Sequence, residues 1–222
     1  MLNILALETA TDACSVAIMS GDAVFELHEV AARQHTDLLF VMIERVLAEA
    51  GLARSAVDLI AFGRGPGAFT GVRIAAGVAQ GIALANDVPL APVSTLAALA
   101  AGGARLYGGR QILAALDARR AQIYLAALRF DDSYAIDESV IADCLLAPEA
   151  VVLAAPTQWL AVGNAWPSYH GRFAADIAAI PRRDLFYPHA EDVARLGGAL
   201  HARGGSVTVA EALPMYLRGA VD

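Results

Sequence analysis

The sequence has 222 residues, of which 57% are hydrophobic and 18% charged, and its formal net charge at pH 7 is −7. This length suffices for one large domain or two small ones with a substantial core. The acidic balance argues against tight autonomous binding to nucleic acid, which relies on Lys and Arg neutralising phosphates.

Several other features narrow the class of protein. No apolar run is long enough to span a bilayer, so we expect no membrane association. The start Met1-Leu2-Asn3 lacks a basic segment, and we therefore expect a cytoplasmic protein without a signal peptide. Cys14 and Cys144 fit no metal spacing, which predicts reduced thiols. The five histidines form no HxxxH or HExxH pair, so we expect no metal site. The surplus of apolar residues favours a protein interface.

The first half of the chain predicts the element order βββαβαβα. Apolar patterns predict strands over residues 3–8, 14–19 and 23–30, and then strands over 57–62 and 88–93. Helices are expected over 36–50, 71–86 and 94–101. The first helix is amphipathic, with apolar residues at helical spacing: Leu38, Leu39, Met42, Ile43, Val46 and Leu47.

The second half repeats this order less regularly. We expect strands over 111–116, 121–130, 139–144 and 159–162, helices over 148–154 and 189–202, and a short β-like run over 206–209. Two glycine pairs, Gly102-Gly103 and Gly108-Gly109, flank the expected connection. The sequence thus predicts a duplicated α/β fold with an N-terminal lobe, residues 1–105, and a C-terminal lobe, residues 106–222.

A glycine-rich loop between the fourth strand and the second helix is the densest motif. Gly63, Gly65 and Gly67 allow the backbone to approach another surface closely, and Thr70 is expected to cap the helix. The helix N-terminus could seat an anion, and Arg73 in its first turn is expected to have a partner. Tight packing of strand and helix explains the glycines equally well. The pattern matches neither a P-loop nor a dinucleotide fingerprint.

Two acidic residues end the first strands of the two halves, Glu8 and Asp117. In a duplicated fold they would face each other across a cleft that could hold a metal–nucleotide. Alternatively, each accepts hydrogen bonds from its own turn. Both following loops lack the glycine needed for close phosphate approach, which weakens the nucleotide hypothesis.

Small residues repeat every four positions along the second helix, at Gly77, Gly81 and Ala85. They predict a flat seam on which another helix can approach closely. Together with the 36–50 helix, the seam favours a helix bundle between subunits, although packing under the chain's own sheet is the alternative. The basic doublets Arg119-Arg120 and Arg182-Arg183 are interpreted as solvated, with RNA contact in a larger assembly as the less favoured reading.

Five segments together resemble the TsaB (YeaZ) family: residues 4–17 (ILALETATDACSVA), 65–73 (GPGAFTGVR), 93–96 (VSTL), 117–119 (DAR) and 214–218 (PMYLR). The resemblance covers nearly the whole chain and is strongest through residue 120. Two positions depart from the family pattern: Glu8 stands where an aspartate is usual, and Ala68 where a serine is usual.

The resemblance implies a two-lobed actin-like ATPase (ASKHA) fold built from duplicated RNase H-like lobes. It also implies a role in forming N6-threonylcarbamoyladenosine in tRNA, in which the paralogue TsaD carries the active site. The metal-binding histidines of TsaD align here with Thr95 and Leu99, neither of which replaces an imidazole. The chain is therefore expected to be non-catalytic, with no tightly bound cofactor. ATP or ADP could bind in the complex, near Glu8, Gly65, Gly67, Thr70 and Asp117.

The resemblance also implies partners. TsaD and TsaE are expected to bind this chain, tRNA to be met only through the complex, and the chain alone to pair with itself. The expected partner interface comprises Leu39, Met42, Ile43, Val46, Arg73, Gly77, Gly81 and Ala85.

Two competing functions remain open. The first is a stand-alone actin-like ATPase or phosphotransferase that uses Glu8 and Asp117. The second is a peptidase, which ranks last because Ser15, Ser94 and Thr70 have no recognisable base nearby in the sequence and GxSxG is absent.

Overall fold

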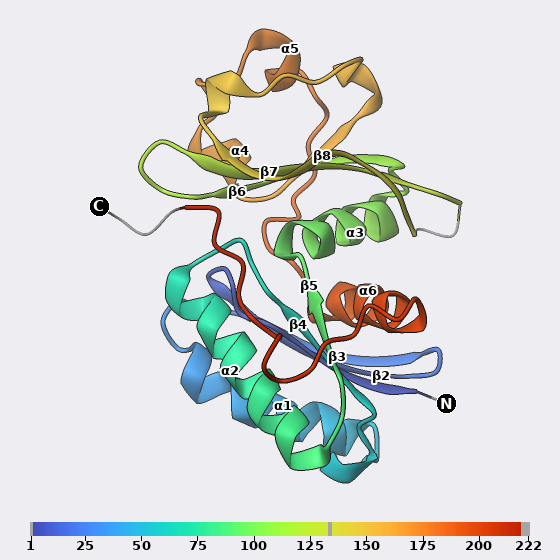
Figure 1. Ribbon diagram of the computed structural model, residues 1–222. Coiled ribbons are helices and arrows are strands. Elements are labelled where there is room, and N and C mark those ends of the chain that lie inside the picture. Colours follow the sequence, from blue (N-terminus) through green and yellow to red (C-terminus); the bar gives the residue numbers. More distant parts are fainter. Residues whose placement is uncertain (1, 133–134, 219–222) are drawn as a thin grey trace. The chain divides into compact units, whose positions relative to one another are not determined.

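The apolar strands of the first hundred residues form a five-stranded sheet in the computed structural model, which describes residues 2–132 and 135–218 (Figure 1). The strands are β1 (Asn3–Glu8), β2 (Ala13–Ser20), β3 (Ala23–Val30), β4 (Leu59–Gly63) and β5 (Leu90–Val93). Their spatial order is β3-β2-β1-β4-β5. β1 to β3 pair antiparallel, whereas β1, β4 and β5 run parallel. β1 is almost completely buried because helices cover both faces of the sheet.

Two helices, α1 (His35–Glu49) and α2 (Phe69–Asn86), cover one face of this sheet. The apolar stripe of α1 packs with the buried face of α2 against Leu7, Val16 and Phe62. α6 (Ala190–Ala202) covers the opposite face, where it packs against Ile4 and Ala61. This arrangement agrees with the predicted element order of the first half.

The chain divides into two units that differ from the expected lobes of residues 1–105 and 106–222. The first unit comprises Met1–Ala98 and Pro188–Met215, and the second Leu99–Tyr187 and Tyr216–Asp222. The correction concerns α6, which we expected in the second lobe. Its Val193 and Ala194 are buried on the first sheet, and Val207 beyond it forms a single bridge with Leu90.

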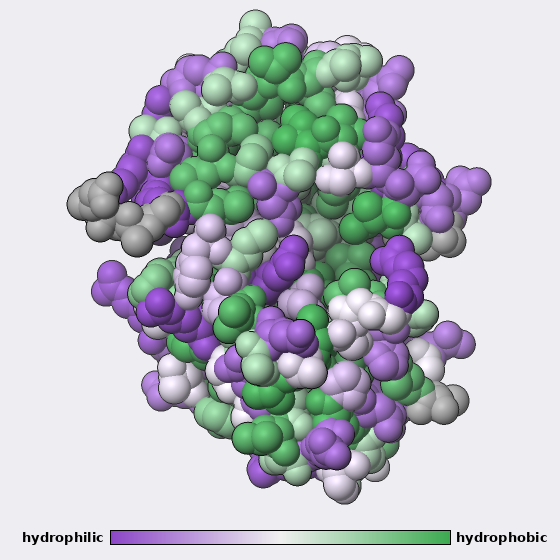
Figure 2. All heavy atoms as spheres, in the orientation of Figure 1, coloured by the Kyte–Doolittle hydropathy of each residue, from purple (hydrophilic) through white to green (hydrophobic). Residues whose placement is uncertain are grey.

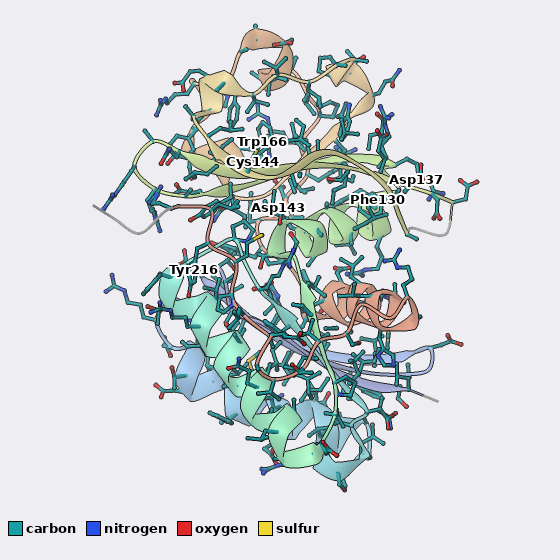
Figure 3. All side chains as sticks on the ribbon, viewed as in Figure 1. Phe130, Asp137, Asp143, Cys144, Trp166 and Tyr216 are labelled. Atoms are coloured by element: carbon teal, nitrogen blue, oxygen red, sulfur yellow. The ribbon has the colours of Figure 1, made fainter. Side chains whose placement is uncertain are left out.

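The second unit contains a four-stranded sheet of order β8-β7-β6-β9. The strands are β6 (Gln111–Asp117), β7 (Ile123–Phe130), β8 (Ile136–Leu146) and β9 (Leu160–Val162). One face packs against the short helices α4 (Ala165–Ser168) and α5 (Ala175–Ala178), with Trp166, labelled in Figure 3, among the buried residues. This sheet repeats the first one without its fifth strand.

α3 (Thr95–Tyr107) extends six residues beyond the predicted end at 101 and passes through Gly102-Gly103, which we expected at a connection. Gly103 lies inside this helix. A Cβ at this position would come within 3.0 Å of Val162 Cγ1, which explains why a glycine occupies it. The glycine thus allows close packing rather than a turn.

The helix predicted over 148–154 is only a 3-10 turn, Pro148–Ala150. α4 and α5 were not predicted, because each is a single turn stabilised by packing rather than by a periodic pattern. Among the helices of the described residues, none is long and apolar enough to cross a membrane.

Candidate functional site

The glycine loop packs against the turn that follows β1. Ala68 N–H donates to Ala10 O at 2.7 Å, and Thr9 Oγ1 donates to Gly71 O at 2.8 Å. A Cβ at Gly67 would overlap Ala10, and one at Gly71 would overlap the Thr9 carbonyl. These glycines therefore make room for the chain's own backbone, which favours the packing interpretation of the motif over the anion seat.

Thr70 does not cap the helix, so that prediction is wrong. α2 begins at Phe69, its N-cap residue is Ala68 with extended backbone, and no side chain caps the first turn. Thr70 is the second helical residue and is exposed. Arg73 has a partner, as expected: its guanidinium carbon lies 3.6 Å from the Phe69 ring centroid.

Glu8 is enclosed by hydrogen bonds from its own unit. Oε1 accepts from Ala10 N–H at 2.7 Å, and Oε2 accepts from Thr95 Oγ1 at 2.9 Å. Thr95 Oγ1 in turn accepts from Gly65 N–H at 3.2 Å. Burial raises the pKa of Glu8 to about 7, against the opposing effect of the hydrogen bonds from Ala10, Thr95 and Thr9. Glu8 therefore joins β1, the glycine loop and the start of α3.

Thr95 and Leu99, the two positions that the resemblance implied to align with metal ligands of TsaD, both serve the fold. The Thr95 hydroxyl donates to Glu8 and accepts from Gly65. Leu99 is completely buried. In the part of the chain that the structure describes, no group of three or more His, Cys, Asp or Glu side chains is arranged to hold a metal ion.

Asp117 occupies the corresponding strand end in the second unit. Its Oδ1 accepts from Arg119 N–H at 2.7 Å and from the Tyr169 hydroxyl at 2.6 Å, while Oδ2 lies 3.1 Å from Arg119 Nη1. Glu8 and Asp117 thus both accept a backbone hydrogen bond from the residue two positions further along the chain. This agrees with the alternative interpretation, in which each accepts hydrogen bonds from its own turn. They belong to different units, and their meeting across a cleft stays a prediction.

Atoms of the chain itself occupy the space inside the glycine loop in which a nucleotide phosphate would have to bind. Gly67 faces Ala10, and a Cβ at Gly65 would lie 3.1 Å from both Met215 O and Val72 Cγ1. Both carboxylate oxygens of Glu8 already accept hydrogen bonds. Binding of ATP or ADP within a complex stays a prediction.

Four residues of the expected partner interface lie in the core, and their prediction is wrong. Leu39, Met42, Ile43 and Val46 are at most 4% exposed, because the apolar stripe of α1 packs against the sheet. The opposite face of α1 instead exposes two large apolar side chains, Phe40 (55%) and Val41 (57%).

The other four expected interface residues lie on the outside of α2. Arg73, Gly77, Gly81 and Ala85 are all exposed, and a Cβ at Gly77 or Gly81 would meet nothing within 4 Å. The seam therefore does not pack under the chain's own sheet. On the face shown in Figure 2, hydrophobic residues reach the surface among hydrophilic ones on the α2 side of the first unit.

Sequence reasoning missed the exposed apolar residues on the outer faces of α1 and α2: Phe40, Val41, Phe69 and Leu84. The signal was present, because these residues fall off the buried stripe of an amphipathic helix. A helix with apolar residues on its outer face as well as its inner face is typical of one that contacts a partner.

A buried polar cluster that the sequence reasoning also missed joins α6 to the first sheet. Ser15 Oγ donates to Glu26 Oε1 at 3.0 Å and accepts from Ala190 N–H at 2.9 Å. Glu26 Oε2 lies 2.9 Å from His189 Nδ1, and the His189 ring stacks on His28. Ser15 is inaccessible to solvent and bonds to a carboxylate rather than to an imidazole. This arrangement does not supply the nucleophile and base of a peptidase.

Comparisons with known proteins give the family. The model of the family described as "TsaD: tRNA N6-adenosine threonylcarbamoyltransferase" matches residues 27–200. The tRNA threonylcarbamoyladenosine biosynthesis protein TsaB of Escherichia coli is 35% identical over 99% of this chain and 96% of its own length. The protein of the same name from Haemophilus influenzae is 33% identical over 99% of this chain and 95% of its own length.

The chain belongs to the TsaB (YeaZ) family. A solved Pseudomonas aeruginosa structure, described as similar to peptidase YEAZ, is 41% identical, with a TM-score of 0.90 over 98% of this chain and 100% of its own. The family match and the two related sheets confirm the predicted two-lobed actin-like fold. The curated relatives are named as tRNA threonylcarbamoyladenosine biosynthesis proteins, which confirms that biosynthetic class for the family.

Proposed function

We propose that this chain is a non-catalytic subunit that binds TsaD and activates it for threonylcarbamoyl transfer to tRNA. The single observation that carries the proposal is the outer face of α2, where an open seam of small residues lies beside exposed apolar side chains. TsaD is the proposed partner because the resemblance implies it, and the match of the TsaD family model to residues 27–200 supports a role in a TsaD-containing complex.

The positions aligned with the TsaD metal ligands support the same role. Thr95 is engaged with Glu8 and Gly65, and Leu99 is a core residue. In this proposal the partner supplies the transfer step. In the absence of TsaD, the same surface would pair two copies of this chain. TsaE, the third expected partner, would join the complex of this chain with TsaD.

The surface has the features of an interface between helices. Gly77 and Gly81 lie on adjacent turns of α2, so the backbone of a partner helix can come close to them. Leu84 (73% exposed) lies three residues from Gly81 on the same helix and supplies apolar area next to this seam, and the exposed Phe69 begins that helix. Exposed aromatic and aliphatic side chains on a helix with a small-residue seam are the composition expected at the centre of an interface.

Gly81→Leu tests the proposal. Because nothing lies within 4 Å of a Cβ at Gly81, the monomer should accept leucine, whereas a helix packed on the seam should be displaced. We expect complex formation with TsaD to weaken by at least about tenfold, equivalent to about 1.4 kcal/mol, in gel filtration or calorimetry. Threonylcarbamoyl transfer by the mixture should fall in parallel.

Gly171→Leu is the matched control, because Gly171 also has open space around its Cβ but lies in the second unit. Circular dichroism should show both variants folded. Unchanged TsaD binding by Gly81→Leu would place the interface elsewhere. Transfer activity of the isolated wild-type chain would contradict the non-catalytic role.

A further inference from the structure

The turn between β6 and β7 holds three consecutive non-glycine residues in the left-handed region. Arg119, Arg120 and Ala121 have φ angles of 61°, 53° and 60°. This conformation places Cβ close to the backbone and is unfavourable for every residue except glycine. Such a run persists only where the surroundings enforce it, and residues of this kind concentrate at ligand-binding and functional positions.

The surroundings of the turn do enforce it. Ala118 N–H donates to Gln122 O at 3.0 Å, and Gln122 N–H donates to Arg119 O at 3.1 Å. Arg218 Nη2 donates to Ala118 O at 3.0 Å and to Gln122 Oε1 at 2.9 Å. Together with the Asp117 hydrogen bonds described above, these contacts make the turn a rigid platform.

Three arginines lie at the platform, and the described residues provide an ion pair for only Arg119 among them. Arg119 is paired with Asp117. The Arg218 contacts just described are to neutral oxygens. Arg120 is exposed and, within residues 2–132 and 135–218, has no hydrogen-bond or ion-pair partner.

Four acidic residues of this unit, Asp131, Asp132, Asp137 and Glu138, lie at the opposite end of β7. Asp132 forms an ion pair with Arg110, and Glu138 forms one with Arg129. At the turn itself, Asp117 is paired with Arg119. The two ends of the β6–β7 hairpin therefore differ in charge, although the chain as a whole is acidic.

We infer that this turn, with Arg120 as its contacting residue and Arg218 as the residue that positions it, binds the phosphodiester backbone of RNA. Guanidinium groups match phosphate oxygens in both charge and geometry. Within the described residues the Arg120 side chain has no hydrogen bond or ion pair that would offset its left-handed backbone, so an external contact would give the arginine a physical role there. RNA is the partner because the curated relatives are named for tRNA modification. The inference rests on the proposed function, since the acidic chain would meet tRNA within the complex.

The test measures tRNA affinity of the complex between this chain and TsaD by fluorescence anisotropy, with unmodified tRNA between 50 and 200 mM salt. For Arg120→Gln we expect affinity to fall roughly three- to tenfold and the logarithmic salt slope to become shallower by about 0.9, the value for one phosphate contact. Arg129→Gln is the control, because that arginine lies at the acidic end of the hairpin.

Arg120→Gly separates the contact from stability. It removes the charge and relieves the left-handed backbone, so the melting temperature should stay unchanged or rise while tRNA affinity falls as in Arg120→Gln. Wild-type affinity and salt slope in both variants would overturn the inference. So would lost ADP binding with unchanged tRNA binding, which would assign the arginine to a free nucleotide phosphate.

Assembly is followed separately by gel filtration. If the wild-type chain and TsaD do not associate, the proposed function fails. The same variants are then compared on the isolated chain at 20 mM salt, where either absence of tRNA binding by the wild type or an affinity unchanged by the substitutions would overturn the inference on its own.

Discussion

Glu8 shows that an acidic residue at the end of a strand can stabilise the fold instead of facing a ligand. The carboxyl group of Glu8 folds back over Gly63, where a Cβ would overlap it, and reaches the Thr95 hydroxyl. The residue is 1% exposed and therefore acts inside the fold, not in a solvent-filled site. Its raised pKa follows from this enclosure, and it makes the stability of the first unit depend on pH.

Glu8→Gln should remove the part of the pH dependence of stability that comes from the Glu8 carboxyl group. The pKa of Glu8 rises from an ordinary 4.5 to about 7, so the folded state binds more protons than the unfolded state between these values. Wild-type stability should therefore fall as pH rises from about 4.5 to 7, by up to roughly 3 kcal/mol at about 1.4 kcal/mol per pKa unit. Urea unfolding at pH 5 and pH 8 measures the difference between the two proteins. Exposed Glu49→Gln is the control, and parallel pH curves for wild type and Glu8→Gln would contradict the assignment.

His28 should contribute a slope of the opposite sign. Burial, together with the charge of His189, lowers the pKa of His28 from 6.5 to about 4, against the opposing effect of the Glu26 charge. The unfolded state therefore binds the extra proton between pH 6.5 and 4, and stability should fall as the pH falls through this window. In His28→Gln the free energy of unfolding should depend less steeply on pH than in the wild type, by up to the slope that the binding of one proton produces. Urea titrations at pH 7, 5.5 and 4.5 measure this slope. A variant with the wild-type slope would show that the imidazole titrates normally.

The loop–helix element from β4 to α2 contains two kinds of glycine that the sequence does not distinguish. Gly67 and Gly71 face the turn after β1, and their missing Cβ atoms allow backbone contact. Gly77 and Gly81 face outward and have open space around them. The first pair is therefore required by the fold, while the second pair weakens the helix unless a partner uses it.

Alanine substitutions should separate these two kinds. Gly71→Ala places a methyl group on the Thr9 carbonyl and should destabilise the chain by about 2–4 kcal/mol, because backbone has to move. Gly77→Ala, in the same helix, should stabilise the monomer by about 0.5–1 kcal/mol through higher helix propensity. Denaturant unfolding of the two variants gives both values. A similar loss in both would mean that Gly77 is also packed.

The whole molecule is built from two related sheets, but the chain does not complete the first before it begins the second. β1 to β5 need α6 to bury Ile4, Leu59 and Ala91, and α6 comes after the entire second unit in sequence. The apolar face that α6 covers is part of the core of the first unit, so the first half of the chain is not a self-sufficient folding unit.

Truncation tests this dependence. A chain that ends at Tyr187 should lose cooperative unfolding of the first unit and aggregate, because the α6 face of its sheet is exposed. A chain that ends at Met215 keeps α6 and Val207 and should stay folded, which makes it the matched control. Circular dichroism and gel filtration distinguish the two outcomes, and a folded monomer from the shorter chain would show that α6 is dispensable.

The sequence by itself determined the elements and the family. Strong apolar periodicity specified β1 to β5, α1, α2 and α6 to within a few residues, because local spacing decides which face of an element is buried. The single-turn helices α4 and α5 left no such trace, since their stability comes from packing around Trp166.

Only the tertiary structure decided which apolar face is core and which is surface. Leu39 and Phe40 are neighbours on one helix, yet the sheet covers the first and leaves the second exposed. The tertiary structure also showed that Gly71 faces the backbone of Thr9 while Gly81 faces open space, and that Arg120 has a left-handed backbone conformation. These distinctions depend on contacts between residues far apart in the sequence, which no local pattern of residue types records.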